Sequence, residues 1–342
     1  MIPDELRCLE HCLPLIANNE VLACESGCRV PLVRGVPRFV DSSNYAAGFG
    51  LQWNAFRKTQ LDSYTGTTIS RDRLTHALGG SLEILKGRSV LEVGCGAGRF
   101  TEVMLNAGAR VFACDLSNAV EANFANCGEH QNYFVCQADA RMLPVGPNSF
   151  DFVICLGVIQ HTPSPEETIA ALARCVKPGG MLVIDHYGPD YPVTFSRRWL
   201  RSLLLRLPPA SAKSLALSLS RVLLPLHKLG WSQKRGRWRL RRQLQKFSPL
   251  VDYYDVYPQL GEKVLAEWAL LDTHDTLTDY YKHLRSVEQI DSCLIACGLV
   301  DTETKYAGNG VEARARMPVN SAKGAEYNSQ GQVPTCRDVA PG

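Results

Sequence analysis

The chain has 342 residues, of which 45% are hydrophobic and 21% are charged, with a formal net charge of +3. This length allows one large α/β domain with a smaller module beside it. The sequence shows no signal-peptide pattern and no apolar run of about 20 residues, which predicts a cytoplasmic protein. Its thirteen cysteines lie largely in or beside apolar runs, so we expect reduced thiols rather than a disulfide framework.

Residues 1–40 contain two cysteine pairs, Cys8 with Cys12 and Cys24 with Cys28. Four thiolates can enclose a tetrahedral zinc ion at about 2.3 Å, and the metal then supplies folding free energy that so small a segment lacks. Each pair has three intervening residues instead of the usual two, so His11 could replace Cys12 as a ligand. The sequence predicts a structural zinc site, with a ribbon that has lost its metal as the alternative. The segment resembles the small zinc-ribbon family that activates tRNA and protein methyltransferases.

Residues 41–88 form a connecting segment with four aromatic residues near helical spacing. We expect these side chains to pack the segment onto the next domain. The alternative is a lid over a bound ligand, with Gln52 and Trp53 facing that ligand.

Residues 89–192 alternate between strand and helix patterns, which predicts a parallel sheet covered on both faces. The stretch VLEVGCGAGRF, from Val90 to Phe100, predicts a strand, a tight turn and the start of a helix. Gly94, Gly96 and Gly98 suit a turn that a ligand must approach closely. Asp115 follows about twenty residues after that turn, where a carboxylate can accept hydrogen bonds from the ribose of a nucleoside.

The successive motifs of this region resemble those of class I S-adenosylmethionine-dependent methyltransferases. They comprise Glu92 and the glycine turn, Asp115, Ala138-Asp139-Ala140, SFDFVICLGVIQHTPSPEE and VKPGGMLVI. Nicotinamide-dependent dehydrogenases, the alternative, usually carry G-x-G-x-x-G, whereas residue 99 here is arginine. The resemblance therefore implies S-adenosylmethionine as the cofactor.

The resemblance also implies roles for individual residues. The three glycines would hold the methionine part of the cofactor, with Glu92 orienting their loop. The ribose and adenine would contact Asp115, Leu116, Asp139, Ala140 and Leu156. His161 lies where the acceptor pocket of this family opens, and we expect it to act as a general base or to position the loop.

Residues 193–285 interrupt the expected methyltransferase pattern. Between Arg197 and Lys246 lie fourteen Lys and Arg residues and no Asp or Glu. Leucine-rich helices edged with basic residues suit a cap over the active site, peripheral contact of residues 197–246 with an anionic membrane, or the phosphates of RNA. An aromatic and acidic stretch follows, in which Tyr253, Tyr254, Asp272 and His274 are candidate acceptor-binding residues, as is Trp53 in the connecting segment.

Residues 286–317 predict the last helix and a closing strand hairpin, and residues 318–342 a disordered tail. The sequence thus predicts an α/β fold with a doubly wound, mostly parallel, Rossmann-like sheet of seven strands whose last strand is antiparallel. The expected function is methyl transfer to a small-molecule or lipid-like acceptor. An RNA methyltransferase and a non-catalytic S-adenosylmethionine-binding partner protein are the alternatives.

Overall fold

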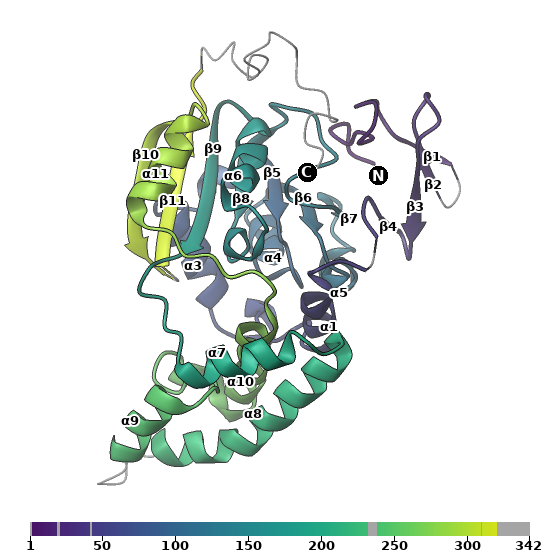
Figure 1. The fold of residues 1–342 in the computed structure, drawn as a ribbon. Helices are drawn as coiled ribbons and strands as arrows, with labels where there is room; N and C mark the ends of the chain where they lie inside the picture. Colours follow the sequence, from purple (N-terminus) through teal and green to yellow (C-terminus); the bar gives the residue numbers. More distant parts are fainter. Residues whose placement is uncertain (1, 19–20, 42, 232–237, 309, 320–342) are drawn as a thin grey trace.

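The computed structural model describes residues 2–18, 21–41, 43–231, 238–308 and 310–319. Within these residues the chain forms two sheets, which lie side by side at one end of the molecule (Figure 1). The larger sheet has seven strands in the order β10-β11-β9-β8-β5-β6-β7. The smaller sheet is antiparallel and belongs to the N-terminal segment.

The strands of the large sheet follow the expected alternation with helices. They are β5 (Ser89–Val93), β6 (Arg110–Asp115), β7 (Tyr133–Gln137), β8 (Phe150–Cys155), β9 (Val176–Tyr187), β10 (Val300–Ala307) and β11 (Gly310–Arg316). Strands β5 to β9 pair in parallel, while β11 runs antiparallel to both β9 and β10. The predicted doubly wound sheet with an antiparallel last strand is therefore confirmed.

Strand β9 begins earlier than the sequence suggests. The stretch Lys177-Pro178-Gly179-Gly180 favours a turn before a strand that starts at Met181, but these residues belong to β9. Phe150 of β8 pairs with Val176 of β9, and Phe152 pairs with Met181. Residues 177–180 of β9 therefore form an irregularity opposite Asp151. Gly180 fits there because a Cβ atom would approach the Asp151 carbonyl oxygen to 2.8 Å.

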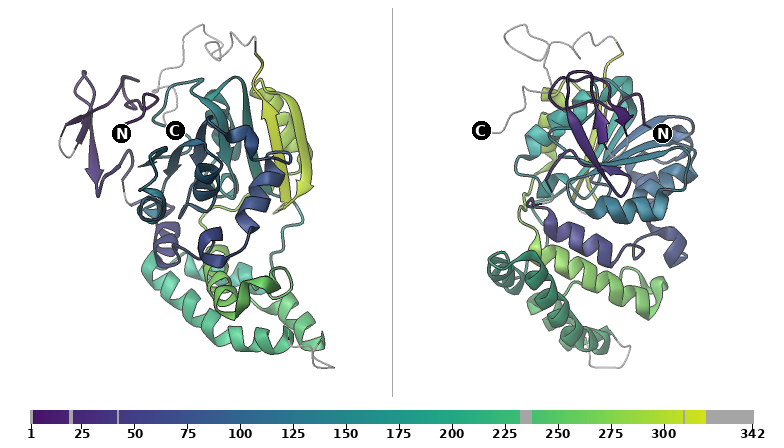
Figure 2. Two further views of the ribbon diagram at one scale, coloured as in Figure 1. Left: turned by 180° about the vertical axis from the view of Figure 1, so that it is seen from behind. Right: turned by 90° about the vertical axis from the view of Figure 1, so that its right-hand side faces the viewer.

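Helices cover both faces of the large sheet (Figures 1 and 2). One face packs against α3 (Ile69–Ala77), α4 (Arg99–Asn106) and α5 (Ala119–Cys127), and the other against α6 (Pro165–Arg174) and α11 (Val287–Ala296). Neighbouring residues of β5 show why both faces are covered. Val90 is buried in the hydrophobic core beneath α3, α4 and α5, and Leu91 is buried in the core beneath α6 and α11. Alternation along a strand thus feeds two hydrophobic cores.

The N-terminal segment forms β1 (Ile16–Asn18), β2 (Val21–Ala23), β3 (Arg29–Val33) and β4 (Val36–Pro37). It joins the large sheet at its β7 edge, where the Phe39 amide donates a 2.9 Å hydrogen bond to the Gln137 carbonyl oxygen. The Arg7 amide likewise donates to the Pro144 carbonyl oxygen at 2.8 Å. Leu6 is buried in the same hydrophobic core as the central strands, so this segment is packed onto the core.

The connecting segment folds into α1 (Ala47–Ala55), α2 (Asp62–Thr65), α3 and the short 3₁₀ helix η1 (Glu83–Leu85). Helix α1 lies between α5 of the core and the inserted helices. Gly50 allows the approach to α5, because a Cβ atom there would come within 3.0 Å of the Asn118 amide nitrogen. On its other side, Gln52 Oε1 lies 2.5 Å from His274 Nδ1, which ties α1 to the insertion.

The insertion between β9 and α11 is helical, with α7 (Phe195–Leu204), α8 (Pro209–Trp231), α9 (Trp238–Phe247), η3 (Pro258–Leu260) and α10 (Gly261–Thr278). Helix α8 starts at the second proline of Pro208-Pro209, since proline suits the first helical position. Helix α10 lies next to α1, whereas α7, α8 and α9 form the outer layer, at the end of the molecule opposite the small sheet (Figures 1 and 2).

Within the described residues, no helix is both long and apolar enough to cross a membrane. The prediction for the tail falls almost entirely on residues 320–342, which lie outside the described part of the chain.

Candidate functional site

The glycine turn follows β5 and leads into α4 as the sequence predicts. Gly94, Gly96 and Gly98 have φ angles of 75°, 50° and 99°, a region that side chains disfavour. A Cβ atom on Gly94 would come within 2.1 Å of Val158 Cγ2. The turn thus needs glycine both for its backbone conformation and for the space beside it.

Asp115 ends β6 directly beside this turn. Its Oδ2 accepts a 3.0 Å hydrogen bond from the Gly96 amide, and its Oδ1 accepts from the amide and hydroxyl of Ser117 at 2.8 and 2.7 Å. Burial raises the pKa of Asp115, although these three hydrogen bonds oppose the shift. A carboxylate offers about four acceptor positions, so one remains for a ligand hydroxyl, and a second becomes available if the Ser117 hydroxyl rotates away.

A cavity of about 850 Å³ opens at the carboxyl ends of the strands. Such a volume is typical of small-molecule sites. Of the predicted residues, it is lined by Trp53, Gly94, Gly96, Asp115, Leu116, Ala140, Leu156, His161, Tyr253 and Asp272. One continuous space therefore connects the glycine turn, the end of β6, the loop after β8 and the inserted helices.

The remaining predicted residues do not line this cavity. Glu92 lies behind the turn, where its Oε2 accepts a 2.5 Å hydrogen bond from the Thr101 hydroxyl, and burial raises its pKa to about 8. Gly98 is the N-cap residue of α4, and a Cβ atom on it would lie 3.1 Å from Cys127 Sγ. These two residues shape the turn from behind.

Three further predictions do not fit the geometry. Both Asp139 oxygens accept hydrogen bonds from Arg141, at distances of 2.8 to 3.2 Å, and Asp139 does not line the cavity. His274 is buried and contacts Gln52, which makes it a link between α1 and α10. Tyr254 packs beside the cluster of Leu260, Leu265 and Trp268 and is likewise absent from the cavity wall.

His161 lies in the short 3₁₀ helix η2 (Ile159–His161) after β8. Its Nδ1 is 3.0 Å from the Tyr281 carbonyl oxygen and 3.4 Å from Asp279 Oδ2. Because a carbonyl oxygen can only accept, Nδ1 carries the proton, which leaves the lone pair of the neutral ring on Nε2. Among the described residues Nε2 has no hydrogen-bond partner, and the ring lines the cavity.

The charges around His161 favour its protonated form. Burial lowers the pKa of His161, but the nearby carboxylates of Asp279 and Asp275 and the Tyr281 carbonyl outweigh burial, so the pKa is raised overall. Asp279 is in turn held by Arg201 of α7, whose Nε donates to Oδ1 at 2.6 Å, and by Lys282 Nζ, 3.0 Å from Oδ2. The insertion thus fixes the orientation of a histidine that belongs to the core.

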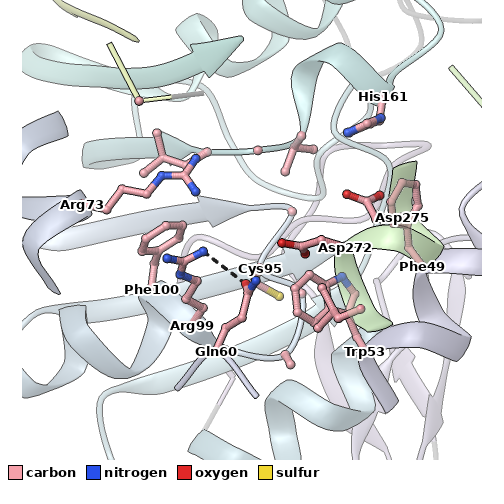
Figure 3. Close-up of a pocket in the computed structure, with 18 of the residues that line it drawn as sticks. Phe49, Trp53, Gln60, Arg73, Cys95, Arg99, Phe100, His161, Asp272 and Asp275 are labelled. Carbon is pink, nitrogen blue, oxygen red and sulfur yellow. Dashed lines mark hydrogen bonds between the residues drawn. The ribbon is translucent and has the colours of Figure 1, made fainter. Parts of the chain in front are cut away.

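Sequence reasoning missed several residues of the cavity wall. Asp275 extends from α10 beside His161, and its buried Oδ1 has no hydrogen-bond partner in the described residues (Figure 3). Trp268 of α10 and Arg73 and Arg99 of the core also line the cavity. Asp275 lies three residues after the predicted Asp272 on the same helix, a spacing that places both on one face and could have indicated its role.

The N-terminal cysteines gather with a histidine. The ligand atoms of Cys8, His11, Cys24 and Cys28 all lie within 4.8 Å of one another, and His11 Nδ1 is 3.0 Å from Cys28 Sγ. The predicted set is corrected at one position, since His11 occupies the place given to Cys12. Cys8 and His11 are separated by two residues, the usual spacing of a ligand pair, whereas Cys8 and Cys12 are separated by three.

The order of the seven strands, the glycine turn after β5 and the carboxylate at the end of β6 form the Rossmann-like arrangement that the resemblance to class I S-adenosylmethionine-dependent methyltransferases implies. Residues 91–184 match a family described as a methyltransferase domain. This segment holds the glycine turn, Asp115 and His161.

Two curated relatives are ubiquinone biosynthesis O-methyltransferases. The protein from Thiobacillus denitrificans is 37% identical over 100 residues, which cover 28% of this chain and 43% of the relative. The protein from Coxiella burnetii is 36% identical over 101 residues, covering 29% and 43%. The chain thus matches less than half the length of either relative.

Among solved structures, a Haemonchus contortus phosphoethanolamine N-methyltransferase 2 is 15% identical, with a TM-score of 0.43, over 79% of this chain and 47% of that one. The fold assignment rests on the strand order and not on this likeness.

Proposed function

We propose that this chain transfers a methyl group from S-adenosylmethionine to a small-molecule or lipid-like acceptor. The observation that carries the proposal is the continuous cavity of about 850 Å³, which joins the glycine turn and Asp115 to His161. The curated relatives, which are O-methyltransferases by name, support a hydroxyl group as the acceptor. The acceptor end of the cavity is built largely by residues outside the matched segment, so the acceptor itself is proposed from this chain alone.

The donor end fits S-adenosylmethionine by its shape and hydrogen bonding. Gly94 and Gly96 present bare backbone to the cavity, and a Cβ atom on either would run into Val158 or Trp53 of the same wall. Asp115 keeps an acceptor position for a ribose hydroxyl. Leu116, Ala140 and Leu156 line the wall on either side. When bound, this cofactor supplies an electrophilic methyl group on a sulfonium ion. The protein mainly needs to align donor and acceptor and to exclude water.

At the acceptor end, His161 is the candidate general base. Its Nδ1–H is held by the Tyr281 carbonyl, so Nε2 can take the proton of an acceptor hydroxyl as the oxygen attacks. The ring contacts Phe49 in a tilted arrangement and Tyr187 edge-on, with ring centroids 5.4 and 5.3 Å away. These aromatic rings, with Tyr253 and Trp53, provide apolar surface for the acceptor.

Calorimetry with S-adenosylhomocysteine tests the donor site, and methyl-tritiated cofactor added to cell extract tests the acceptor class. We expect binding, and label that partitions into the lipid or small-molecule fraction. Label in RNA would support the RNA methyltransferase instead. Binding without any methyl transfer would support the non-catalytic partner protein.

We further propose a structural zinc ion bound by Cys8, His11, Cys24 and Cys28. Three thiolates and one imidazole are a common zinc donor set, and the four ligand atoms are already within 4.8 Å of one another. The ion would join the loop before β1 to the turn between β2 and β3. Stoichiometric zinc in freshly purified protein supports this site, and a metal-free protein with unchanged melting temperature contradicts it.

We also propose that the outer helices contact an anionic membrane surface. On α7, Phe195 and Trp199 are 81% and 61% exposed, and on α8 Val222 is 70% exposed. Arginines such as Arg198 flank these apolar residues, and each basic group contributes about 1 kcal/mol of attraction to an anionic surface.

Vesicle sedimentation tests this surface, with phosphatidylcholine alone compared with phosphatidylcholine plus phosphatidylserine. Trp199→Ser with Val222→Ser should reduce binding to the anionic vesicles. The control Ile16→Ser, which changes a 71% exposed residue of the small sheet, should not. Equal binding by all variants, or salt-sensitive binding to RNA only, contradicts the proposal.

A further inference from the structure

Arg99 is the first residue of α4, directly after the glycine turn, and its guanidinium lines the cavity. Its Nε donates a 2.9 Å hydrogen bond to the Ser70 hydroxyl and its Nη1 a 3.2 Å bond to Gln60 Oε1. Both partners are neutral. Among the described residues, no carboxylate lies within ion-pair distance of Arg99 and nothing accepts a hydrogen bond from its Nη2.

The surroundings hold this guanidinium in place. Its central carbon lies 5.1 Å from the ring centroid of Phe100 and 5.5 Å from that of Trp268. Arginine stacked in this way keeps a fixed plane, and its remaining N–H groups keep a fixed direction. In Figure 3, Arg99 lies beside Gln60 at the end of the cavity away from His161.

Several neighbouring polar side chains already have partners. Arg73, which also stacks on Phe100, pairs with Asp185, and His76 pairs with Glu312 at 2.7 Å. Asp272, also in the cavity wall, accepts a hydrogen bond from the Tyr253 hydroxyl. Arg197, a further cation of this wall, has no carboxylate partner in the described protein either, but its guanidinium donates to the carbonyl oxygens of Pro249, Pro192 and Leu250. Among the described residues, Arg99 therefore combines the lack of a counter-ion with an Nη2 group that has no acceptor. Burying an unpaired charge is costly, and burial beside Arg73 lowers the pKa of Arg99 to about 10.

We propose that Arg99 is an anion subsite that binds a carboxylate of the ligand through Nη2. A guanidinium matches a carboxylate in shape, and a hydrogen bond between charged groups contributes about 1.5–3 kcal/mol. The carboxylate can come from the methionine half of S-adenosylmethionine or from the acceptor. The subsite deepens the proposed function, on which the first of these sources rests.

Two nucleosides separate the two sources. S-adenosylhomocysteine carries the methionine-type carboxylate, whereas 5′-methylthioadenosine has the same nucleoside and thioether without it. If the cofactor carboxylate binds here, Arg99→Gln weakens S-adenosylhomocysteine about 10- to 150-fold and changes 5′-methylthioadenosine less than about threefold. Arg99→Lys should recover part of the loss, and the control Arg110→Gln, an exposed residue at the start of β6, should change neither.

If the acceptor supplies the carboxylate, Arg99→Gln leaves both nucleosides unchanged. Acetate or inorganic phosphate then binds to the wild-type complex with S-adenosylhomocysteine, and this binding is lost in Arg99→Gln. The proposal is overturned if Arg99→Gln affects neither nucleoside nor anion binding. An equal loss for both nucleosides also overturns it, since that result indicates a packing role.

The failure of the proposed function has a different signature. If the wild-type protein binds neither nucleoside, the cofactor assignment is wrong. Acetate or phosphate binding to the free protein still tests the subsite. Binding that is lost in Arg99→Gln supports the subsite, and binding that is unchanged in Arg99→Gln contradicts it.

Discussion

Asp272 gives the sharpest test of how the cavity affects stability. Its carboxyl lines the cavity and is hydrogen-bonded by Tyr253. Burial, opposed by the hydrogen bond from Tyr253, raises the pKa of Asp272 to about 7. In the unfolded chain the pKa is about 3.9. The folded protein therefore keeps this proton over a pH range in which the unfolded chain has already lost it.

The sign of the effect follows from this difference. Between about pH 4 and pH 7 the unfolded chain is stabilised by ionisation and the folded protein is not, so the free energy of unfolding falls as pH rises. Three pKa units correspond to about 4 kcal/mol, an upper limit reached above pH 7. Asparagine cannot ionise, but its carbonyl oxygen still accepts a hydrogen bond from Tyr253.

We therefore expect Asp272→Asn to match the wild type near pH 4 and to be more stable at pH 8, by up to about 4 kcal/mol. Urea unfolding followed by circular dichroism across this range measures the difference. The control Asp301→Asn changes an exposed residue of β10 and should show no such trend. A stability difference for Asp272→Asn that does not vary with pH would refute the reasoning.

Three further predictions concern the donor site, the base and the metal. Asp115→Ala should weaken the binding of S-adenosylhomocysteine about 10- to 150-fold by calorimetry, because one hydrogen bond to a charged acceptor is lost. Burial raises the pKa of Asp115, so binding to the wild type should weaken on acidification at a higher pH than an ordinary aspartate would give. Asp279→Asn removes an anion that raises the pKa of His161, so the acidic limb of the pH–rate profile should move to lower pH, and a limb that moves upward or stays fixed contradicts the role of Asp279. Cys24→Ser should release zinc and lower the melting temperature, whereas Cys175→Ser, a buried thiol of the core, should leave the zinc content unchanged.

The sheet and the placement of Asp115 beside the glycine turn could be predicted because their signals are local. The glycine turn needs particular backbone angles at Gly94 and Gly96, and Asp115 lies at a fixed spacing after it. Such features follow from a short stretch of chain. The register irregularity in β9 could not be predicted, because it arises from the pairing with Phe150 and Phe152 in another strand.

The acceptor end was less predictable because it depends on contacts between distant segments. His274 and Asp275 are adjacent in sequence, but His274 faces Gln52 of α1 and Asp275 faces the cavity. Composition alone favoured both His274 and Tyr254 as acceptor residues. Which residues of α10 line the cavity was decided only by how α10 packs against α1, α7 and α8.

Arg201 connects the outer helix α7 to the surroundings of His161. Its guanidinium, on the same helix as the exposed Trp199, contacts Asp279, and Asp279 contacts His161. Two contacts therefore separate the outer surface from the candidate base. A substitution on α7 that displaces Arg201 would therefore also remove a cation that holds Asp279 beside His161.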